Sequence, residues 1–295
     1  MKAIYRNFFI GTAFAVLASG LASCDDVKPD DRYILGEEIK VERAVLLEDF
    51  TGQMCVNCPE AHEVIEQLEQ QFGRDKVIAV SIHCGAFGIS TDRTRFDAGM
   101  TGLMTAEGNA IMEAYGINSF PMGVIDMGRP QTFDLWPTAV RNALQVSTDV
   151  KIDMTVNYTP GTDDTAEKFT GTIDIKAVVE SGSDRLANVQ FWVVENEIVA
   201  LQRNLSTTVR DYVHNNVFRG QAFPGIRGSE VALTKGIDTE VTASLANRWS
   251  DTEHWNVNNL SIVAFVSDKS GVLQVTRVPL VEKPEEPGDE SDPEE

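Results

Sequence analysis

The chain has 295 residues, of which 42% are hydrophobic, enough for about two ordinary domains with cores of their own. Its formal net charge of −20 gives an acidic surface, which disfavours binding to nucleic acid and to anionic lipid headgroups. We therefore expect no nucleic-acid partner.

The N-terminal segment has the pattern of a secretory signal. Lys2 and Arg6 precede an apolar run from Phe8 to Leu17, and small residues follow it. This run is too short to cross a hydrocarbon core of about 30 Å as a helix. The segment ends in Leu21-Ala22-Ser23-Cys24, which resembles a bacterial lipobox. This resemblance implies that residues 1–23 are a lipoprotein signal peptide and that Cys24 is lipidated.

An ordinary signal peptide with a chance cysteine is the alternative. With lipid on Cys24, the mature chain would be anchored to a membrane without spanning it. Its net charge would be −22, because removal of residues 1–23 takes away Lys2 and Arg6 but no acidic residue. Residues 24–40 are acidic and aperiodic, which predicts a flexible tether. Acidic residues after the lipidated cysteine also resemble the surface-export signals of some Gram-negative lipoproteins; an incidentally charged linker is the alternative.

The chain contains four cysteines: Cys24, Cys55, Cys58 and Cys84. If Cys24 carries lipid, three remain in an exported, oxidising setting. An odd number argues against a scaffold of structural disulfides. It suits one redox pair and one single cysteine.

Residues 41–147 have the pattern of an α/β domain. A strand over residues 41–50 is followed by Cys55-Val56-Asn57-Cys58-Pro59 and by an amphipathic helix that ends near Phe72. The cysteines thus lie where a strand passes into the first turn of a helix. Unpaired backbone N–H groups and the helix dipole stabilise a thiolate there and lower the pKa of the more exposed cysteine.

The remaining elements of this region follow in order. Val77–Ile82 is predicted to be a second buried strand, and residues 86–104 are an irregular insertion that suggests a functional or lid-like segment. A helix from Thr105 to Tyr115, a strand entered through Pro121 and a helix capped by Asp134 complete the domain.

Apolar and polar residues alternate over residues 148–281, which predicts an antiparallel β-sandwich of immunoglobulin-like type. Residues 196–235 are less regular and are expected to carry loops over one end. The segment 282–295 consists mainly of Pro, Glu and Asp, and is predicted to be disordered. The expected strands are Val150–Tyr158, Phe169–Val179, Val189–Val194, Leu260–Val266 and Val272–Val281.

The first domain resembles the thioredoxin fold in three features that occur in the right order. They are the Cys-x-x-Cys pair between strand and helix, Asp49 on the preceding strand, and the segment Tyr115-Gly116-Ile117-Asn118-Ser119-Phe120-Pro121. The resemblance implies that Asp49 is the buried carboxylate that assists proton transfer at the inner cysteine. It also implies that Pro121 follows a cis peptide bond and lies against the disulfide.

The chain departs from the thioredoxins around the cysteines. Met54 stands where they carry Trp, and Val56-Asn57 replaces their Gly-Pro. These departures leave the redox potential and the substrate range open.

Most of the mature chain resembles the twenty-eight-kilodalton outer-membrane-protein family of bacterial lipoproteins. The residues that carry this resemblance are the lipobox, Asp49-Phe50-Thr51-Gly52 and Asp211-Tyr212-Val213-His214-Asn215-Asn216. The resemblance implies a thioredoxin-like domain followed by an immunoglobulin-like β-sandwich, and lipid anchoring to the outer membrane on its periplasmic or cell-surface face. Members of this family are often described as outer-membrane proteins or adhesins.

The redox hypothesis gives each site residue a role. Cys55 is the exposed attacking thiolate, and Cys58 is the buried resolving thiol. Asp49 is a poorly solvated carboxylate with a raised pKa that accepts the Cys58 proton. Pro121 offers a strand-like edge to the substrate backbone. The expected partners are protein thiols or disulfides, with no cofactor.

Two alternatives remain. In the first, Cys55–Cys58 is a permanent disulfide, and the protein is a surface binding or adhesin-like protein whose β-sandwich meets an envelope partner. In the second, zinc is bound by residues drawn from Cys55, Cys58, His62, His83 and Cys84. Pro59 and Asp49 have roles in a redox site and none in a zinc site, so we predict no metal.

Other candidate residues are given structural roles. Trp192, Trp249 and Trp255 are expected to pack in the core or at its rim rather than to bind sugar. His62 is expected to be a solvated helix residue. His214 and His254 are lone histidines in the sequence and support no site.

Overall fold

The computed structural model describes residues 41–91, 101–162, 169–246 and 255–281. The predicted signal peptide (1–23), the lipidated Cys24, the tether (24–40) and the acidic tail (282–295) lie outside these residues, as do Trp249 and His254. Of the helices in the described ranges, none combines the length and the apolar character needed to cross a membrane.

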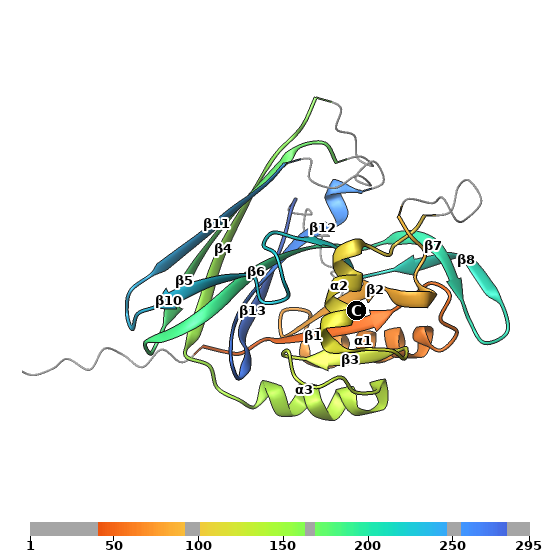
Figure 1. The fold of residues 1–295 in the computed structure, drawn as a ribbon, viewed down its shortest axis with the longest axis horizontal. Helices are drawn as coiled ribbons and strands as arrows, with labels where there is room; N and C mark the ends of the chain where they lie inside the picture. Colours follow the sequence, from red (N-terminus) through yellow and green to blue (C-terminus); the bar gives the residue numbers. More distant parts are fainter. Residues whose placement is uncertain (1–40, 92–100, 163–168, 247–254, 282–295) are drawn as a thin grey trace, which may run out of the picture. The chain divides into compact units, whose positions relative to one another are not determined.

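An eight-stranded mixed sheet forms the centre of the structure (Figure 1). Its strands are β1 (Val45–Thr51), β2 (Val77–His83), β3 (Met122–Ile125), β6 (Arg185–Glu195), β9 (Val217–Gln221), β10 (Ser229–Leu233), β12 (Leu260–Asp268) and β13 (Gly271–Pro279). Their order is β13-β12-β6-β9-β2-β1-β3, and β10 pairs with β6 outside this path. The β1–β2 and β2–β9 pairs are parallel, and the other pairs are antiparallel.

The pairing of β2 with β9 joins strands from the two sides of residue 147. Ser81 is the register partner of Val217 in this pair. The backbone N–H of Ser81 donates to the carbonyl oxygen of Asn216 at 2.6 Å. The regions predicted as two domains therefore contribute strands to one sheet, while the boundary near residue 147 stays a prediction.

Three α-helices pack beside the strands of residues 41–147. Helix α1 has a proline in its first turn, where no intrahelical hydrogen bond is lost. Helix α2 begins after Thr105, as predicted, and the Thr105 side chain caps it by accepting a hydrogen bond from the N–H of Gly108 at 3.0 Å. The prediction that Asp134 caps the third helix is wrong, because Asp134 lies inside a short 3₁₀ helix that runs directly into α3. The helices are α1 (Cys58–Phe72), α2 (Ala106–Tyr115) and α3 (Trp136–Leu144).

Helices α1 and α3 cover one face of β1 and β2. Leu47 of β1 packs in a single cluster with Ile65 of α1 and with Trp136 and Val140 of α3. Gly123 of β3 is required here, because an added Cβ would come within 2.3 Å of the Trp136 indole.

The other face of β1 and β2 packs against α2, which lies in front of these strands in Figure 1. Leu46 and Phe50 of β1 share a cluster with Ile111 of α2, Phe265 of β12 and Val275 of β13. The large sheet therefore curves, so that strands from its far end face the first strands of the chain.

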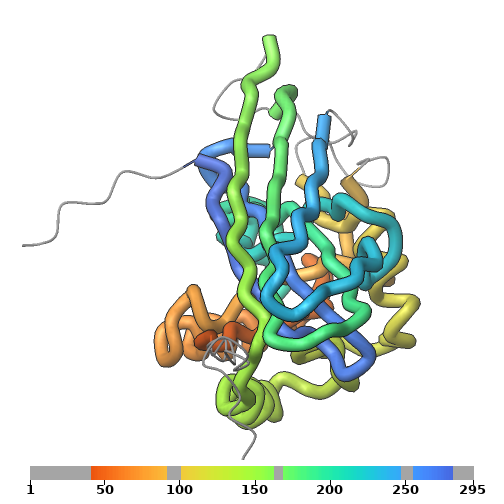
Figure 2. Tube along the Cα trace, turned by 90° about the vertical axis from the view of Figure 1, so that its left-hand side faces the viewer, coloured from red at the N-terminus to blue at the C-terminus, as the bar shows by residue number. Residues whose placement is uncertain are grey.

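A separate antiparallel sheet covers the remaining face of β6 and β12. Ile173 from this sheet packs against Phe191 of β6 and Ile262 of β12. Trp192 and Trp255 are fully buried, which confirms their predicted place in the core. The strands of this separate sheet are β4 (Val150–Thr159), β5 (Thr172–Ser181) and β11 (Thr239–Ala246), in the order β11-β5-β4. Figure 2 shows them side by side.

Residues 196–235 are more regular than the sequence pattern indicated. They contain β9 and β10 of the large sheet and a two-stranded antiparallel hairpin of β7 (Ile198–Arg203) and β8 (Thr208–His214). The β7–β8 pairing has a register shift between Ala200 and Gln202. The extra residue lies on β8 and interrupts the two-residue alternation there. In β7, the less buried Val199 and Leu201 are apolar like the buried Ile198 and Ala200, so its sequence does not alternate between apolar and polar residues.

Candidate functional site

Cys55 and Cys58 form a disulfide at the start of α1. Cys58 is the first residue of the helix, and the preceding loop continues directly from β1. The predicted position between strand and helix is therefore confirmed. The prediction that Cys55 is exposed is wrong, since it is 4% exposed and Cys58 is 0% exposed.

Gln53 fixes the loop before the disulfide to two distant segments. Its side-chain Nε2 donates to the carbonyl oxygens of Thr101 at 3.0 Å and Leu201 at 3.2 Å. Its Oε1 accepts from the N–H of Leu103 at 3.1 Å. The loop is thus held both by the end of the 86–104 insertion and by β7.

Gln202 of β7 makes a second connection. Its Nε2 donates to the carbonyl oxygens of Cys55 at 2.9 Å and Gly52 at 3.4 Å. The cysteine loop is also bonded to the segment after β2, where the N–H of Met54 donates to the carbonyl oxygen of Phe87 at 2.9 Å. An added Cβ on Gly52 would lie 2.5 Å from the Phe87 backbone, so this approach requires glycine. Together these contacts enclose the loop and account for the burial of the Cys55 side chain.

Asp49 is fully buried on β1 and directs its carboxylate toward α1. Its Oδ2 accepts a hydrogen bond from the hydroxyl of Ser81 on β2 at 3.1 Å and lies 3.5 Å from Nε2 of His62 on α1. Among the described residues, no group forms a hydrogen bond with its Oδ1. One carboxylate oxygen is therefore available to a further proton donor beside the helix start.

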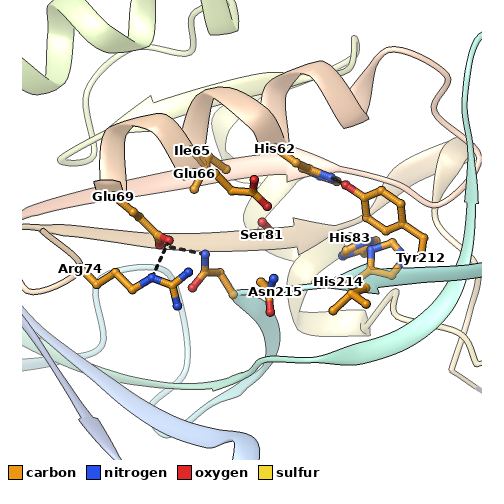
Figure 3. Close-up of a pocket in the computed structure, with 12 residues that line it drawn as sticks. His62, Ile65, Glu66, Glu69, Arg74, Ser81, His83, Tyr212, His214 and Asn215 are labelled. Carbon is orange, nitrogen blue, oxygen red and sulfur yellow. Dashed lines mark hydrogen bonds and ion pairs between the residues drawn. The ribbon is translucent and has the colours of Figure 1, made fainter. Parts of the chain in front are cut away.

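His62 is held on both ring nitrogens. Nε2 lies 3.1 Å from the hydroxyl of Thr51, and Nδ1 lies 2.9 Å from the phenol of Tyr212 on β8 (Figure 3). Its side chain is only 14% exposed. The expectation of a solvated helix histidine is wrong, because a strand from the second half of the chain covers this position.

Two further histidines lie next to His62. The His83 and His214 ring centroids are 5.1 Å apart, and those of His62 and His214 are 6.5 Å apart. Burial lowers the pKa of His214 to about 3 and holds the pKa of His83 well below its usual value, with nearby histidines adding to both effects. Both rings are therefore neutral near pH 7. His214, predicted to be a lone residue, instead belongs to a three-histidine cluster along a pocket between α1 and β8.

Pro121 follows a cis peptide bond, as the thioredoxin resemblance implies, and is buried at the start of β3. Strand β3 pairs with β1 so that Met122 is the partner of Phe50 and Gly123 the partner of Asp49. The register therefore places Pro121 beside the end of β1, where the chain enters the cysteine loop.

Glu48 is a second buried carboxyl on β1 that the sequence predictions missed. It accepts a hydrogen bond from the phenol of Tyr115 at 2.9 Å, and burial raises the pKa of Glu48 to about 8. Successive strand residues point to opposite faces, so Glu48 faces α2 while Asp49 faces α1. The adjacent acids in an apolar strand were the signal that could have identified it.

Cys84 is fully buried at the end of β2. Its sulfur lies 4.0 Å from the carbonyl oxygen of Thr51, and burial, with the charge of Asp49, raises the pKa of the Cys84 thiol. The zinc alternative would need Cys55 and Cys58 as free thiolates, and here they are joined to each other. The described residues contain no group of His, Cys, Asp and Glu side chains placed to hold a metal ion.

Asn216 connects α1 with the second half of the chain. Its Nδ2 donates to Oε1 of Glu69 at 3.0 Å, and its Oδ1 accepts from Arg277 at 3.0 Å. Arg277 also donates to the carbonyl oxygen of Ala79 on β2 at 2.7 Å. The segment Asp211–Asn216 thus supplies the ring contact to His62 and the anchor that holds β8 and β9 against α1.

A family model for the outer membrane protein Omp28 matches residues 108–283, which is more than half of the chain. The chain belongs to the Omp28 family. The match includes Pro121 and Asp211–Asn216 and does not include Asp49, Cys55 or Cys58. The family match therefore covers the part of the site that comes from residues 108–283, and the cysteines lie outside it.

Comparison with solved structures supports one likeness in fold. HBP35 of Porphyromonas gingivalis is 14% identical and has a TM-score of 0.60, with 81% of this chain and 76% of that one covered. A domain of the outer membrane lipoprotein Omp28 from the same organism is 20% identical over 45% of this chain and 88% of its own, with a TM-score of 0.30. No curated protein sequence matches the chain. Of these two structures, only HBP35 is similar enough to indicate a shared fold.

Proposed function

We propose that this Omp28-family protein is an outer membrane lipoprotein with a thioredoxin-like site that exchanges thiols and disulfides through Cys55 and Cys58. The observation that carries the proposal is the disulfide at the first turn of α1, with the buried Asp49 directed at the same helix. The position of Pro121, beside the end of β1, supports it further. We assign the elements of residues 41–147 to a thioredoxin-like fold and those of 148–281 to an immunoglobulin-like sandwich.

The exchange uses the two cysteines in turn. The Cys55 thiolate attacks a substrate disulfide, forms a mixed disulfide and releases one substrate sulfur as a thiolate. Cys58 then gives its proton to Asp49 and attacks the Cys55 sulfur, and the second substrate thiolate leaves. The cysteine pair loses two electrons and the substrate gains them. The Cys58 proton goes to Asp49, and the two substrate thiolates take their protons from solvent. The reverse sequence oxidises a substrate dithiol.

We assign the partners and the location from the sequence and the family. The substrates are proteins that carry thiols or disulfides, and Cys24 holds the chain to the outer membrane through lipid. The family description, outer membrane protein, supports this location. Protease treatment of intact cells tests which face carries the protein: digestion places it on the cell surface, and protection places it on the periplasmic face.

A second candidate function is favoured by the burial of both cysteines. Cys55 is 4% exposed, and hydrogen bonds from Gln53 and Gln202 hold its loop. In a non-catalytic binding protein, this disulfide would only stabilise the loop, and the β-sandwich would meet an envelope partner.

The reduction potential of the Cys55–Cys58 pair separates the two functions. A value well below about −300 mV, in the range of structural disulfides, would contradict the exchange function. A Cys58→Ser variant should trap substrates as mixed disulfides on Cys55, whereas a matched Cys84→Ser variant should trap none. Failure of Cys58→Ser to trap any protein would favour the binding function.

A further inference from the structure

Asp49 has no direct contact with solvent. It is 0% exposed, and its Oδ2 contacts Ser81 and His62. A buried carboxylate that receives the Cys58 proton must pass it on, and passing it on while Cys58 reacts draws the transfer forward. His62 is the titratable group nearest to its carboxylate among the described contacts, and its side chain is partly exposed.

We propose that His62 relays the proton between Asp49 and solvent while Cys58 reacts, and that Tyr212 holds the His62 ring for this transfer. The inference rests on the proposed thiol–disulfide exchange and adds residues to it. His62 acts through Asp49, and Tyr212 acts through His62, so Tyr212 is a positioning residue.

The two ring nitrogens of His62 face opposite sides. Nε2 faces Asp49 at 3.5 Å and Thr51 at 3.1 Å, and Nδ1 faces the phenol of Tyr212 at 2.9 Å (Figure 3). When Cys58 is oxidised, Nε2 takes the proton from Asp49 and Nδ1 releases one toward Tyr212 and solvent. When Cys58 is reduced, the protons move in the opposite direction. Each passage moves one proton and leaves the ring neutral.

Tyr212 is suited to hold the ring without keeping the proton. Burial raises the pKa of Tyr212 to about 12, so its phenol stays neutral and can both donate and accept a hydrogen bond. The other ionisable groups around His62 shape the pH profile of the relay. They are His83 on β2, His214 on β8, and Glu63 and Glu66 on α1 itself.

The relay is tested with detergent-purified protein that carries Cys84→Ser. The protein is first reduced and then reacted with dithiobis-nitrobenzoate. The first nitrobenzoate thiolate is released when Cys55 attacks, and the second is released when Cys58 attacks. For His62→Gln, we expect an unchanged first release and a second release at least tenfold slower near pH 7, with partial rescue by imidazole buffer. Tyr212→Phe should slow the second release several-fold, and Val199→Ala, an exposed β7 control, should not.

A double variant tests whether His62 acts through Asp49. In an Asp49→Asn background, His62→Gln should cause no further slowing. A second release within twofold of the parent in both His62→Gln and Tyr212→Phe would overturn the relay, as would a full additional loss in the Asp49→Asn background. Tyr212→Phe removes a single oxygen, so it tests the relay even if His62→Gln fails to fold. No release from the parent would instead contradict the proposed function.

Discussion

Asn216 and Glu69, 147 residues apart in the sequence, are joined by a 3.0 Å hydrogen bond from Nδ2 to Oε1. Asn216 has a φ of +58°, in the left-handed region that asparagine tolerates better than most residues. Its other side-chain atom accepts from Arg277. A single turn residue therefore connects α1, β9 and β13.

Two substitutions separate the contributions to stability of the Asn216 side-chain hydrogen bonds and of its left-handed backbone conformation. Asn216→Gly keeps the backbone conformation and removes both hydrogen bonds, one of them to a buried charged group, so it should cost about 2–4 kcal/mol of unfolding free energy. Asn216→Ala should cost about 1 kcal/mol more, because alanine is strained at positive φ. Denaturant unfolding measures both values. Equal stabilities for the two variants would contradict the role of the left-handed conformation.

Glu48 should make stability fall as the pH rises. Its pKa is raised from 4.5 to about 8 in the folded protein, so between these values the folded state binds more protons than the unfolded state, and unfolding becomes easier with pH. The buried His83 and His214, whose pKa values are lowered, have the opposite effect up to about pH 7.5, because their unfolded forms still bind protons there. Asp126, with its pKa raised to about 6, adds to the Glu48 effect mainly below that value. A comparison of the parent with Glu48→Gln between pH 6.5 and 8 therefore isolates Glu48, because both proteins keep these histidines.

Between pH 6.5 and 8, we expect the unfolding free energy of the parent, relative to that of Glu48→Gln, to fall by up to about 1.4 kcal/mol per pH unit. Glu48→Gln keeps an acceptor for the Tyr115 phenol and should remove the slope. Chemical unfolding at several pH values between 6.5 and 8 measures it. A slope that is unchanged in Glu48→Gln would show that another group is responsible.

Gln202→Ala should make the disulfide easier to reach. The substitution removes the hydrogen bonds to the carbonyl oxygens of Cys55 and Gly52, which lowers the cost of opening the loop by about 1 kcal/mol. Reduction by dithiothreitol should then be about five times faster than in the parent. Leu205→Ala, at an exposed position between β7 and β8, is the matched control and should leave the rate unchanged. Equal rates in all three proteins would mean that β7 does not limit access.

Cys84 should resist alkylation in the folded protein. Its side chain is fully buried and its thiol pKa is raised, so little thiolate is present and little reagent can reach it. Labelling by iodoacetamide, read by mass spectrometry, should be at least a hundredfold slower than in denaturant. Labelling within tenfold of the denatured rate would show that this side chain is exposed by local opening.

The helices beside the disulfide could be predicted because the residues that define them lie within one short segment each. Pro59 and the apolar spacing from Ala61 to Phe72 define α1 within one segment, and Thr105 defines the start of α2. The cis bond before Pro121 followed from the thioredoxin resemblance.

The surroundings of the disulfide could not be predicted in the same way. Gln202 contacts Cys55 from 147 residues away, and Tyr212 contacts His62 from 150 residues away. Nothing in the local sequence of α1 distinguishes a covered histidine from a solvated one. The hairpin that provides both contacts was itself missed, because β7 carries apolar residues on both faces and β8 contains the extra residue of the register shift.

The parallel pairing of β2 with β9 has a consequence for synthesis. Ser81 and Val217 are 136 positions apart, so β2 has no neighbour on that side until the ribosome has translated well past residue 217. Until then, one side of an apolar strand is open to pairing with other chains. The nascent protein therefore carries an unpaired edge on β2 until much of its second half has been synthesised.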